Sequence, residues 1–163
     1  MIQIRTATLE DFEQIWPIFH AIVAAGETYT YPRETNKEQA QQLWLSTPKQ
    51  TLVAEEDGMI LGSYFIKTNQ TGGGSHVCNC GYMVSPDARG RGLARMMCEH
   101  SQALAVTLGY RAMQFNFVVS SNEVAVRLWT TLGFATVGHL PRAFHHPLLG
   151  DVDALVMYKW LTA

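Results

Sequence analysis

One stretch decides the fold of this chain: residues 82–94, which read Tyr-Met-Val-Ser-Pro-Asp-Ala-Arg-Gly-Arg-Gly-Leu-Ala. It starts at the end of an apolar strand, turns through arginine and glycine, and opens a helix that we expect over 93–108. Glycine lets the backbone approach a ligand closely, and the first N–H groups of a helix have no partner inside it. Arg89, Arg91 and Arg95 add positive charge to that helix start. The pattern therefore indicates a site for a phosphate or pyrophosphate.

Two common phosphate-binding motifs do not fit this stretch. The lysine followed by serine or threonine of a P-loop is missing, and the dinucleotide fingerprint needs a third glycine and a preceding βαβ unit. An exposed helix start that happens to carry arginines stays open as the alternative.

The segments on either side alternate between strand and helix patterns. Apolar residues recur at helical spacing after Asp11, Asn36 and Asn122, and Pro17 should kink or split the first of these helices. Asp57-Gly58 is typical of a tight hairpin turn. The expected strands are 2–5, 51–55, 59–67, 76–84, 112–119, 134–140 and 154–160. This order predicts a mixed α/β fold with a central sheet of about seven strands and about four helices.

Composition and charge limit the class of protein. The chain has 163 residues, 47% of them hydrophobic, with 12 basic and 14 acidic side chains and a net charge of −2. We expect a single domain over 1–163 and no nucleic-acid partner. We also expect no contact with a membrane, since no apolar run reaches about 18 residues. The N-terminus lacks the pattern of a secretory signal.

The three cysteines, Cys78, Cys80 and Cys98, do not form the even set of a disulfide scaffold. Reduced thiols in the cytoplasm are the simpler expectation. A metal site from Cys78, Cys80 and His76 is the alternative, but it lacks the second spaced pair of ligands of a zinc site. We therefore expect no metal.

Two motifs follow strands in a fixed order. The first is R-x-x-G-x-A at Arg89, Gly92 and Ala94, and the second is N-x-x-A-x-x-L-W-x-x-x-G-F from Asn122 to Phe134. Together they resemble the GCN5-related N-acetyltransferase (GNAT) family over nearly the whole chain. The resemblance implies a mostly antiparallel, twisted sheet whose middle strands, at 76–84 and 112–119, splay apart. It also implies acetyl-CoA as cosubstrate.

The family resemblance implies roles for the residues that match its motifs. Backbone N–H groups at the helix start would hold the pyrophosphate; these belong to Arg89, Gly90, Arg91, Gly92, Leu93 and Ala94. The backbone at Met83 and Val84 would pair with the pantetheine arm as another strand would. The N–H of Val84 would also stabilise the oxyanion. Asn122 would contact the cofactor near its thioester or pantetheine end.

The chain departs from the family where many members carry a tyrosine that protonates the leaving thiolate. Here the residue is Trp129, whose indole donates a hydrogen bond but supplies no proton at useful pH. Tyr82, an ordered water, or unassisted departure of the thiolate are the alternatives, and packing against the sheet is the simpler interpretation of Trp129. No aspartate or glutamate occurs in 77–84, where some members place the general base.

Two asparagines, Asn79 and Asn116, interrupt largely apolar strands. A buried amide costs about 1–3 kcal/mol unless its hydrogen bonds are satisfied, so each either bonds neighbouring backbone or binds a polar substrate. The runs at 62–65, 75–79, 115–118 and 121–122 resemble fungal acetyltransferases that act on azetidine-2-carboxylate and related proline analogues. That resemblance implies that Asn79 and Asn116 hold or polarise the amine and carboxylate of the acceptor.

The loop between the first two helices commonly walls the acceptor site in this family, and here it carries Glu27, Tyr29 and Tyr31. Partly exposed loop tyrosines are the alternative interpretation. The segment 141–152 is expected as a loop that covers the site, which favours a small acceptor. Candidate general bases are Glu27, His76, His100, His139, His145 and His146, and deprotonation through water is the alternative.

These features predict an acetyl-CoA-dependent N-acetyltransferase whose acceptor is a small-molecule amine, such as an amino acid or an amino-acid analogue. A protein N-terminus or lysine is the alternative acceptor, and a module that binds acetyl-CoA without turnover is the alternative to an enzyme. The apolar strand at 154–160 would allow pairing with a second copy in a homodimer.

Overall fold

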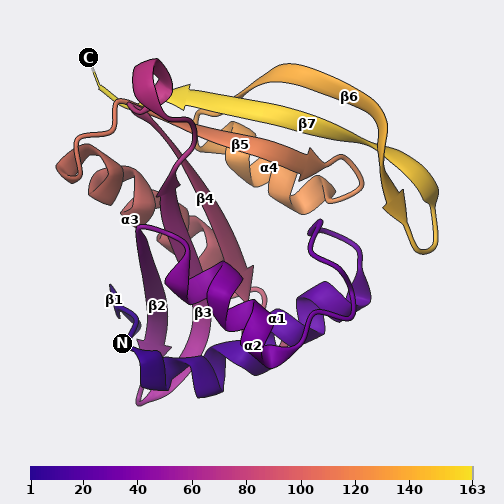
Figure 1. The fold of residues 1–163 in the computed structure, drawn as a ribbon. Coiled ribbons are helices and arrows are strands. Elements are labelled where there is room, and N and C mark those ends of the chain that lie inside the picture. The colour runs from indigo at the N-terminus through magenta and orange to yellow at the C-terminus, as the bar shows by residue number, and fades with distance from the viewer. Residues whose placement is uncertain (163) are drawn as a thin grey trace.

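The computed structural model describes residues 1–162 and contains a seven-stranded sheet in the order β1-β2-β3-β4-β5-β7-β6 (Figure 1). Neighbouring strands are antiparallel except β4 and β5, which are parallel. The strands are β1 (Gln3–Thr6), β2 (Gln50–Glu56), β3 (Met59–Thr68), β4 (Val77–Val84), β5 (Ala112–Val119), β6 (Ala135–His146) and β7 (Gly150–Trp160). The predicted mixed α/β class and the order of its elements are confirmed.

Helices pack on both faces of this sheet. The α-helices in residues 1–162 are α1 (Phe12–Ala25), α2 (Lys37–Gln41), which continues as a π-helical turn over Gln42–Ser46, α3 (Leu93–Thr107) and α4 (Glu123–Thr131). Apolar side chains of α1 and α2 pack on one face, and those of α3 and α4 pack on the other (Figure 1). None of the described helices has the length and apolar character that crossing a bilayer requires.

Local sequence explains where these helices begin and continue. Asn36 and Asn122 cap α2 and α4, as predicted, by accepting hydrogen bonds from the backbone N–H groups three residues ahead. Pro17 does not split α1, which runs without interruption to Ala25. The reason is that Ile15, Ile18 and Phe19 on either side of it are buried. Their burial outweighs the loss of one backbone hydrogen bond.

The join between β4 and β5 positions the site. The two strands pair at Val77 with Ala112 and at Cys78 with Met113, and then they separate. The pairing of β5 with β7 is also irregular between Phe115 and Val118. The predicted splay of the middle strands is therefore confirmed, and the backbone of β4 beyond Cys78 has no strand on its β5 side.

The C-terminal hairpin corrects two predictions. The segment 141–152 is not a covering loop: β6 runs to His146, β7 starts at Gly150, and the hairpin projects outward from the sheet (Figure 1). Pro141 is tolerated because β6 is an edge strand and its register shifts between Leu140 and Phe144. The strand at 154–160 is not free to pair with another chain, because β5 and β6 occupy both of its edges. A homodimer stays a prediction.

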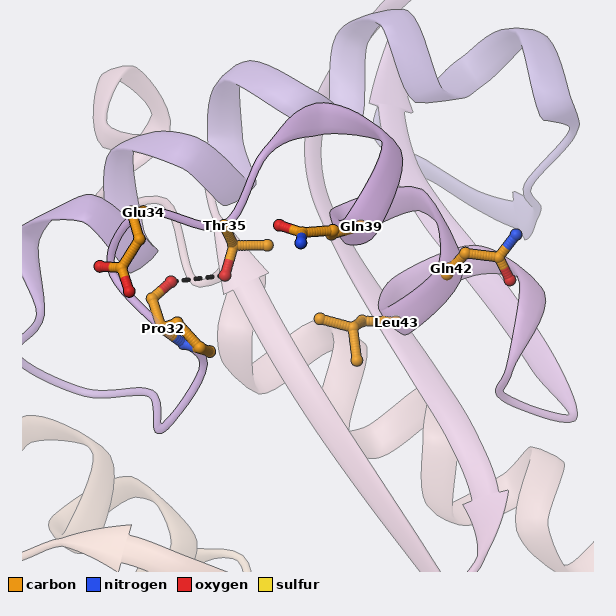
Figure 2. Close-up of a pocket in the computed structure, with 6 residues that line it drawn as sticks. All are labelled: Pro32, Glu34, Thr35, Gln39, Gln42 and Leu43. Carbon is orange, nitrogen blue, oxygen red and sulfur yellow. Dashed lines mark hydrogen bonds between the residues drawn. The ribbon is translucent and has the colours of Figure 1, made fainter.

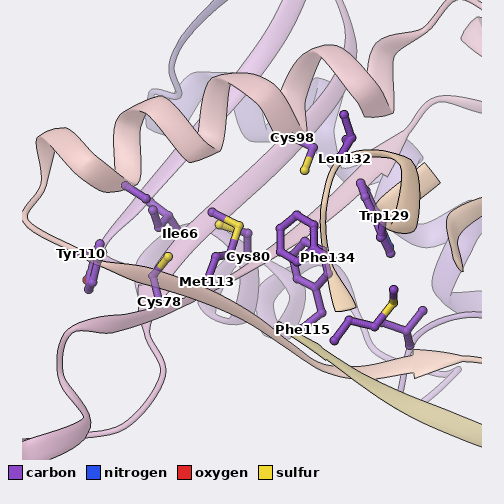
Figure 3. Packing of buried hydrophobic residues seen from close by; sticks show 13 residues of the cluster. Ile66, Cys78, Cys80, Cys98, Tyr110, Met113, Phe115, Trp129, Leu132 and Phe134 are labelled. Carbon is purple, nitrogen blue, oxygen red and sulfur yellow. The ribbon is translucent and has the colours of Figure 1, made fainter. Parts of the chain in front are cut away.

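Aromatic residues fill the core between the sheet and the helices α3 and α4 (Figure 3). Phe115 stacks on Phe134 with ring centroids 4.3 Å apart, and Trp129 lies 5.1 Å from both Phe115 and Tyr82. The cysteines Cys78, Cys80 and Cys98 are buried and free. Within residues 1–162 no cluster of three or more metal-binding side chains occurs, so the alternative of a metal site has no support there.

Candidate active site

A cleft of about 970 Å³ follows β4 through the gap between β4 and β5. Its walls come from the C-terminal part of α1 and the following loop, from β3, β4 and β5, from the start of α3, and from α4. The strand residues Asn79 and Val84 mark its two ends, roughly 17 Å apart at about 3.3 Å per residue. We call the part beside the α3 start the cofactor end, and the part around Asn79 the acceptor end.

The cofactor end is built from backbone. Gly90 and Gly92 have φ angles of 79° and 75°, in the left-handed region that favours glycine. A Cβ at either position would meet no atom within 4 Å, so the backbone conformation rather than crowding selects glycine. Gly92 is the N-cap of α3, and the N–H groups that follow it have no partner within the helix.

Arginine side chains surround this helix start unequally. Arg89 and Arg95 line the cleft, together with Gly90, Gly92, Leu93 and Ala94. Arg91 does not line it, because its guanidinium donates to Glu56 of β2 at 2.9 Å. This pairing lowers the pKa of the Glu56 carboxyl. The structure therefore gathers the predicted cofactor residues at one place but turns the side chain of Arg91 away.

Backbone groups of β4 alternate between its two sides. At the ends of the β3–β4 ladder, Asn69 N–H bonds Val77 O and Ser85 N–H bonds Leu61 O, so odd-numbered residues of β4 bond β3. The N–H groups that face the gap belong to Cys80, Tyr82 and Val84. The N–H of Val84 therefore faces the gap, as its predicted roles require. The backbone of Met83 faces β3 instead, which does not support its predicted pairing with the pantetheine arm.

The acceptor end is built from side chains on the α1 face of the sheet. Asn79 donates from Nδ2 to the carbonyl oxygen of Gln114 at 2.9 Å, where the ladder between β4 and β5 stops. A carbonyl oxygen can only accept a hydrogen bond, so the NH2 group of the Asn79 amide must face Gln114. This fixes the orientation of the amide and turns Asn79 Oδ1 away from that carbonyl. Asn79 therefore satisfies neighbouring backbone with its Nδ2, while its Oδ1 accepts no hydrogen bond within residues 1–162.

Asn116 lies on β5, also beside the gap, and its amide is held on both sides. Its Oδ1 accepts from Gln114 Nε2 at 2.9 Å, and its Nδ2 donates to Asn69 Oδ1 at 2.7 Å. Asn116 is exposed and lines the cleft. The sequence missed Asn69 as its partner, because that contact joins residues 47 positions apart.

Aromatic side chains cover the acceptor end, as predicted for the loop after α1. Tyr29 donates to the carbonyl oxygen of Tyr82 at 2.8 Å and stacks on Tyr31 with centroids 5.6 Å apart. Burial raises the pKa of both hydroxyls, that of Tyr31 to about 12. A Cβ at Gly81 would lie 2.5 Å from Phe65 Cε2, so glycine is required for these rings to lie on β4. Glu27 is exposed and lines the rim.

The predicted histidine bases lie elsewhere. His100 hydrogen-bonds with the Tyr64 hydroxyl at 2.8 Å, and burial lowers its pKa. His139 and His145 bond Asp153 and Asp151. In the described chain no histidine is among the residues that line the cleft; those predicted were His76, His100, His139, His145 and His146.

Two aromatic residues bear on the question of which group protonates the leaving thiolate. The Tyr82 hydroxyl hydrogen-bonds with Ser101 Oγ of α3 at 2.6 Å, and burial raises its pKa. That hydroxyl is engaged on the core side, so the structure does not support Tyr82 as the acid. Trp129 and the cap residue Asn122 both line the cleft. Trp129 is 8% exposed and packs on Tyr82 and Phe115, which favours the packing interpretation.

A second hollow of about 520 Å³ lies between α2 and the end of the loop that follows α1 (Figure 2). It is lined by Pro32, Glu34, Thr35, Gln39, Gln42 and Leu43. Glu34 is its single charged lining residue, and the hydroxyl of Thr35 bonds the Pro32 carbonyl within the loop itself. This arrangement offers no reactive group, so the cleft along β4 is the candidate active site.

The fold matches that of known proteins. The model of the acetyltransferase (GNAT) family matches residues 9–134, so the chain belongs to this family and is an acyltransferase. The structure of a GCN5-related N-acetyltransferase from Kribbella flavida has a TM-score of 0.93, with 46% identity and 98% of each chain covered.

Two further relatives are more distant. N-acetyltransferase aca1 of Schizosaccharomyces pombe is 37% identical over 79 residues, which make up 48% of this chain but only 38% of that protein. The structure of yncA from Salmonella typhimurium, with its cofactor acetyl-CoA, is 23% identical with a TM-score of 0.83, covering 100% and 95% of the two chains. At that identity the likeness shows the fold.

Proposed function

We propose that this enzyme acetylates the amine of a small molecule, an amino acid or an amino-acid analogue. Acetyl-CoA is the acetyl donor, and its thioester supplies the activated acetyl group. The observation that carries the proposal is the acceptor end: polar amides of Asn79 and Asn116 lie beside the gap, under a wall made by Tyr29 and Tyr31. Such a partly enclosed, mixed polar and aromatic site suits a small polar acceptor.

The cofactor end fits a pyrophosphate. The open backbone at Gly90 and Gly92 and the free N–H groups at the start of α3 form an anion cradle. Arg89, which has no ion pair within residues 1–162, adds positive charge, and Arg95 lies beside it in a pair with Glu99. Asn122, at the start of α4, would contact the pantetheine arm.

The row of N–H groups along β4 would serve both the pantetheine arm and the oxyanion. Val84 is the nearest of the three to the cofactor end, so we assign its N–H to the pantetheine arm, as an added strand would bond it. Cys80 and Tyr82 lie closer to Asn79, where the amine would sit. We therefore move the oxyanion role, predicted for Val84, to the N–H of Cys80 or Tyr82.

In the reaction, a C–N bond forms at the amine, the thioester C–S bond breaks, and the proton lost by nitrogen balances the one gained by the thiolate. Asn79 Oδ1 would accept from the amine and direct its lone pair toward the acetyl carbon. No histidine lines the cleft in the described chain. We therefore propose that water carries both protons, with Glu27 as the carboxylate at the rim.

Kinetics with an amine panel test this proposal. Wild-type protein with acetyl-CoA should release free thiol that depends on an amino acid or analogue, azetidine-2-carboxylate included. Asn79→Ala and Asn116→Ala should each lower kcat/KM for the best acceptor by about 10-fold or more, since each removes a polar contact. Asn36→Ala, which removes the cap of α2 at a residue that does not line the cleft, is the control for lost stability.

Two outcomes would contradict the proposal. If both cleft variants kept the wild-type kcat/KM, the acceptor site would lie elsewhere. If peptides were acetylated much faster than every free amine, the acceptor would be a protein.

The three buried, free cysteines support the expected cytoplasmic location, where thiols stay reduced. An active enzyme with these thiols fully reduced is the corresponding expectation.

A further inference from the structure

Lys67 is a cation at the acceptor end that the sequence analysis did not single out. It lies on β3 directly opposite Asn79 of β4, in the register that also sets Phe65 opposite Gly81. Residues two apart on a strand share a face, so Lys67 and Phe65 point to the same side of the sheet as Asn79. All three line the cleft.

The position of the Lys67 ammonium is restrained. Its Nζ lies 5.4 Å from the centroid of the Phe65 ring, and the side chain is half-buried. A cation over an aromatic face is attracted by the ring, which keeps it over the cleft rather than extended into solvent. The ammonium is therefore held above the floor of the acceptor end.

The charge of Lys67 is not compensated within residues 1–162. Lys37 pairs with Glu13, and Lys159 donates to Gln102 and to a backbone carbonyl, whereas Lys67 has no hydrogen bond or ion pair in the described chain. The cleft contains two other cations, Arg89 and Arg95, and both lie at the cofactor end. The acceptor end thus presents one cation without an ion-pair partner, and Glu27 at the rim is the carboxylate that lines the same cleft.

We infer that Lys67 binds the carboxylate of the acceptor. This inference rests on the proposed function and deepens it, because it makes the carboxylate a requirement rather than an option. Across the ladder, Asn79 Oδ1 would accept from the amine, so one acceptor molecule meets a hydrogen-bond acceptor and a cation side by side. That pair of contacts matches an amino group and a carboxylate on one carbon or on neighbouring carbons.

The aromatic wall limits the rest of the acceptor. Phe65 lies under Lys67, and Tyr29 reaches the same hollow, where its hydroxyl oxygen would be 3.2 Å from a Cβ at Gly81. These surfaces favour a small, largely apolar body between the two polar groups. A compact α-imino or α-amino acid has this form, whereas a peptide carries an amide where the carboxylate is needed.

Matched pairs of acceptors test the inference. Each free amino acid in the panel, with azetidine-2-carboxylate included, is compared with its own carboxamide, which keeps the amine and removes the negative charge. For wild-type protein we expect kcat/KM to favour the acid over the amide. Lys67→Met should reduce that preference by about 10- to 100-fold, mostly through KM, because a hydrogen bond to a charged group is worth about 1.5–3 kcal/mol. Lys67→Arg should restore most of it.

Lys49→Met is the matched control. Lys49 also lies 5.4 Å from an aromatic centroid, that of Tyr110, but it does not line the cleft. Its substitution should leave both the acid preference and the acceptor KM unchanged. A binding measurement without turnover accompanies the kinetics: calorimetry of the best acid with the protein–CoA complex should show weaker binding for Lys67→Met and unchanged affinity for CoA itself.

The outcomes separate the inference from the proposed function. If wild-type protein binds CoA but acetylates no small amine, the proposed function fails and the assignment of Lys67 fails with it. If wild-type protein acetylates small amines but treats acids and amides alike, or if Lys67→Met keeps the acid preference, only the assignment of Lys67 is overturned.

Discussion

The two ends of the cleft are built in different ways. At the cofactor end the contact surface is backbone: the turn with Gly90 and Gly92, and the exposed N–H groups at the start of α3. At the acceptor end it is side chain, from Tyr29, Asn79 and Asn116 on three separate elements. The backbone site needs residues close together in the sequence, whereas the side-chain site needs the whole sheet to bring its parts together.

The two constructions suit the two ligands, because the cofactor is always the same molecule whereas the acceptor has to be distinguished from other amines. A pyrophosphate is the same in every molecule of acetyl-CoA, and a continuous turn is sufficient to bind it. An acceptor is distinguished by the positions of its amine, charge and apolar body, so several independent side chains have to converge. Substitutions at the two ends should therefore affect different kinetic constants.

The largest effect is expected from Gly92→Glu at the cofactor end. It sets a side chain on a left-handed backbone and a negative charge at the helix start, so the Kd for CoA should rise at least about 100-fold. Calorimetry measures this change. Gly58→Glu is the control, because Gly58 has a φ of 80° and open space around it in the turn between β2 and β3. CoA affinity that is equal in the two variants would remove the basis for the pyrophosphate site.

An intermediate effect is expected from Gly81→Ala at the acceptor end. The new Cβ would lie 2.5 Å from Cε2 of the rigid Phe65 ring, so the aromatic wall has to shift. Overpacking of this kind costs about 1–3 kcal/mol of stability, and kcat/KM for the acceptor should fall about 10-fold. CoA affinity should stay within about 3-fold of wild type. Gly73→Ala, in open space, is the control. A variant that lost CoA binding while keeping its acceptor KM would contradict the division of the cleft.

The smallest effect at neutral pH is expected from the tyrosines of the aromatic wall, whose raised pKa values affect stability only in alkali. Burial favours the neutral form of Tyr29 and Tyr31, so their pKa values are raised in the folded state above about 10 in the unfolded state. Stability is therefore full below pH 10 and falls as pH rises toward 12, by up to about 1.4 kcal/mol per pH unit for each tyrosine. Tyr64 and Tyr82 contribute to the same decline.

Urea unfolding between pH 9 and pH 11 measures this slope. The double variant Tyr29→Phe, Tyr31→Phe should show a shallower decline than wild type, after the loss of the Tyr29 hydrogen bond lowers its stability at neutral pH by about 1 kcal/mol. Equal slopes would mean that these hydroxyls are hydrated in the folded protein.

Much of the fold was predictable because its signals are local. Asp57-Gly58 gives the hairpin, Asn36 and Asn122 give the caps, and the periodicity of α3 gives its length. The C-terminal hairpin was not predictable in the same way. Pro141 and the residues His145-His146-Pro147 read as a loop, because the edge position that tolerates them depends on the neighbouring strand.

The site, like the fold, was predictable where its residues are close in the sequence and less so where they are distant. Its predicted cofactor residues lie within 83–94, with Asn122 as the one exception. The structure gathers them where they were expected, except for the side chain of Arg91 and the backbone of Met83. Tyr29, Asn79 and Asn116 were expected at the acceptor end and line it. Lys67 and Asn69 were missed, because a lysine and an asparagine near the end of a strand also occur as ordinary solvated residues.

By itself the sequence determined which segments become strands and helices, and where a backbone turn would accept an anion. These properties follow from periodicity, caps and glycine, which act over a few residues. Only the tertiary structure decided that Lys67 would face Asn79, that Asn69 would hold Asn116, and that β7 would be enclosed by β5 and β6. Strand register and strand order set those contacts, and both are fixed by the packing of the complete sheet rather than by any single segment.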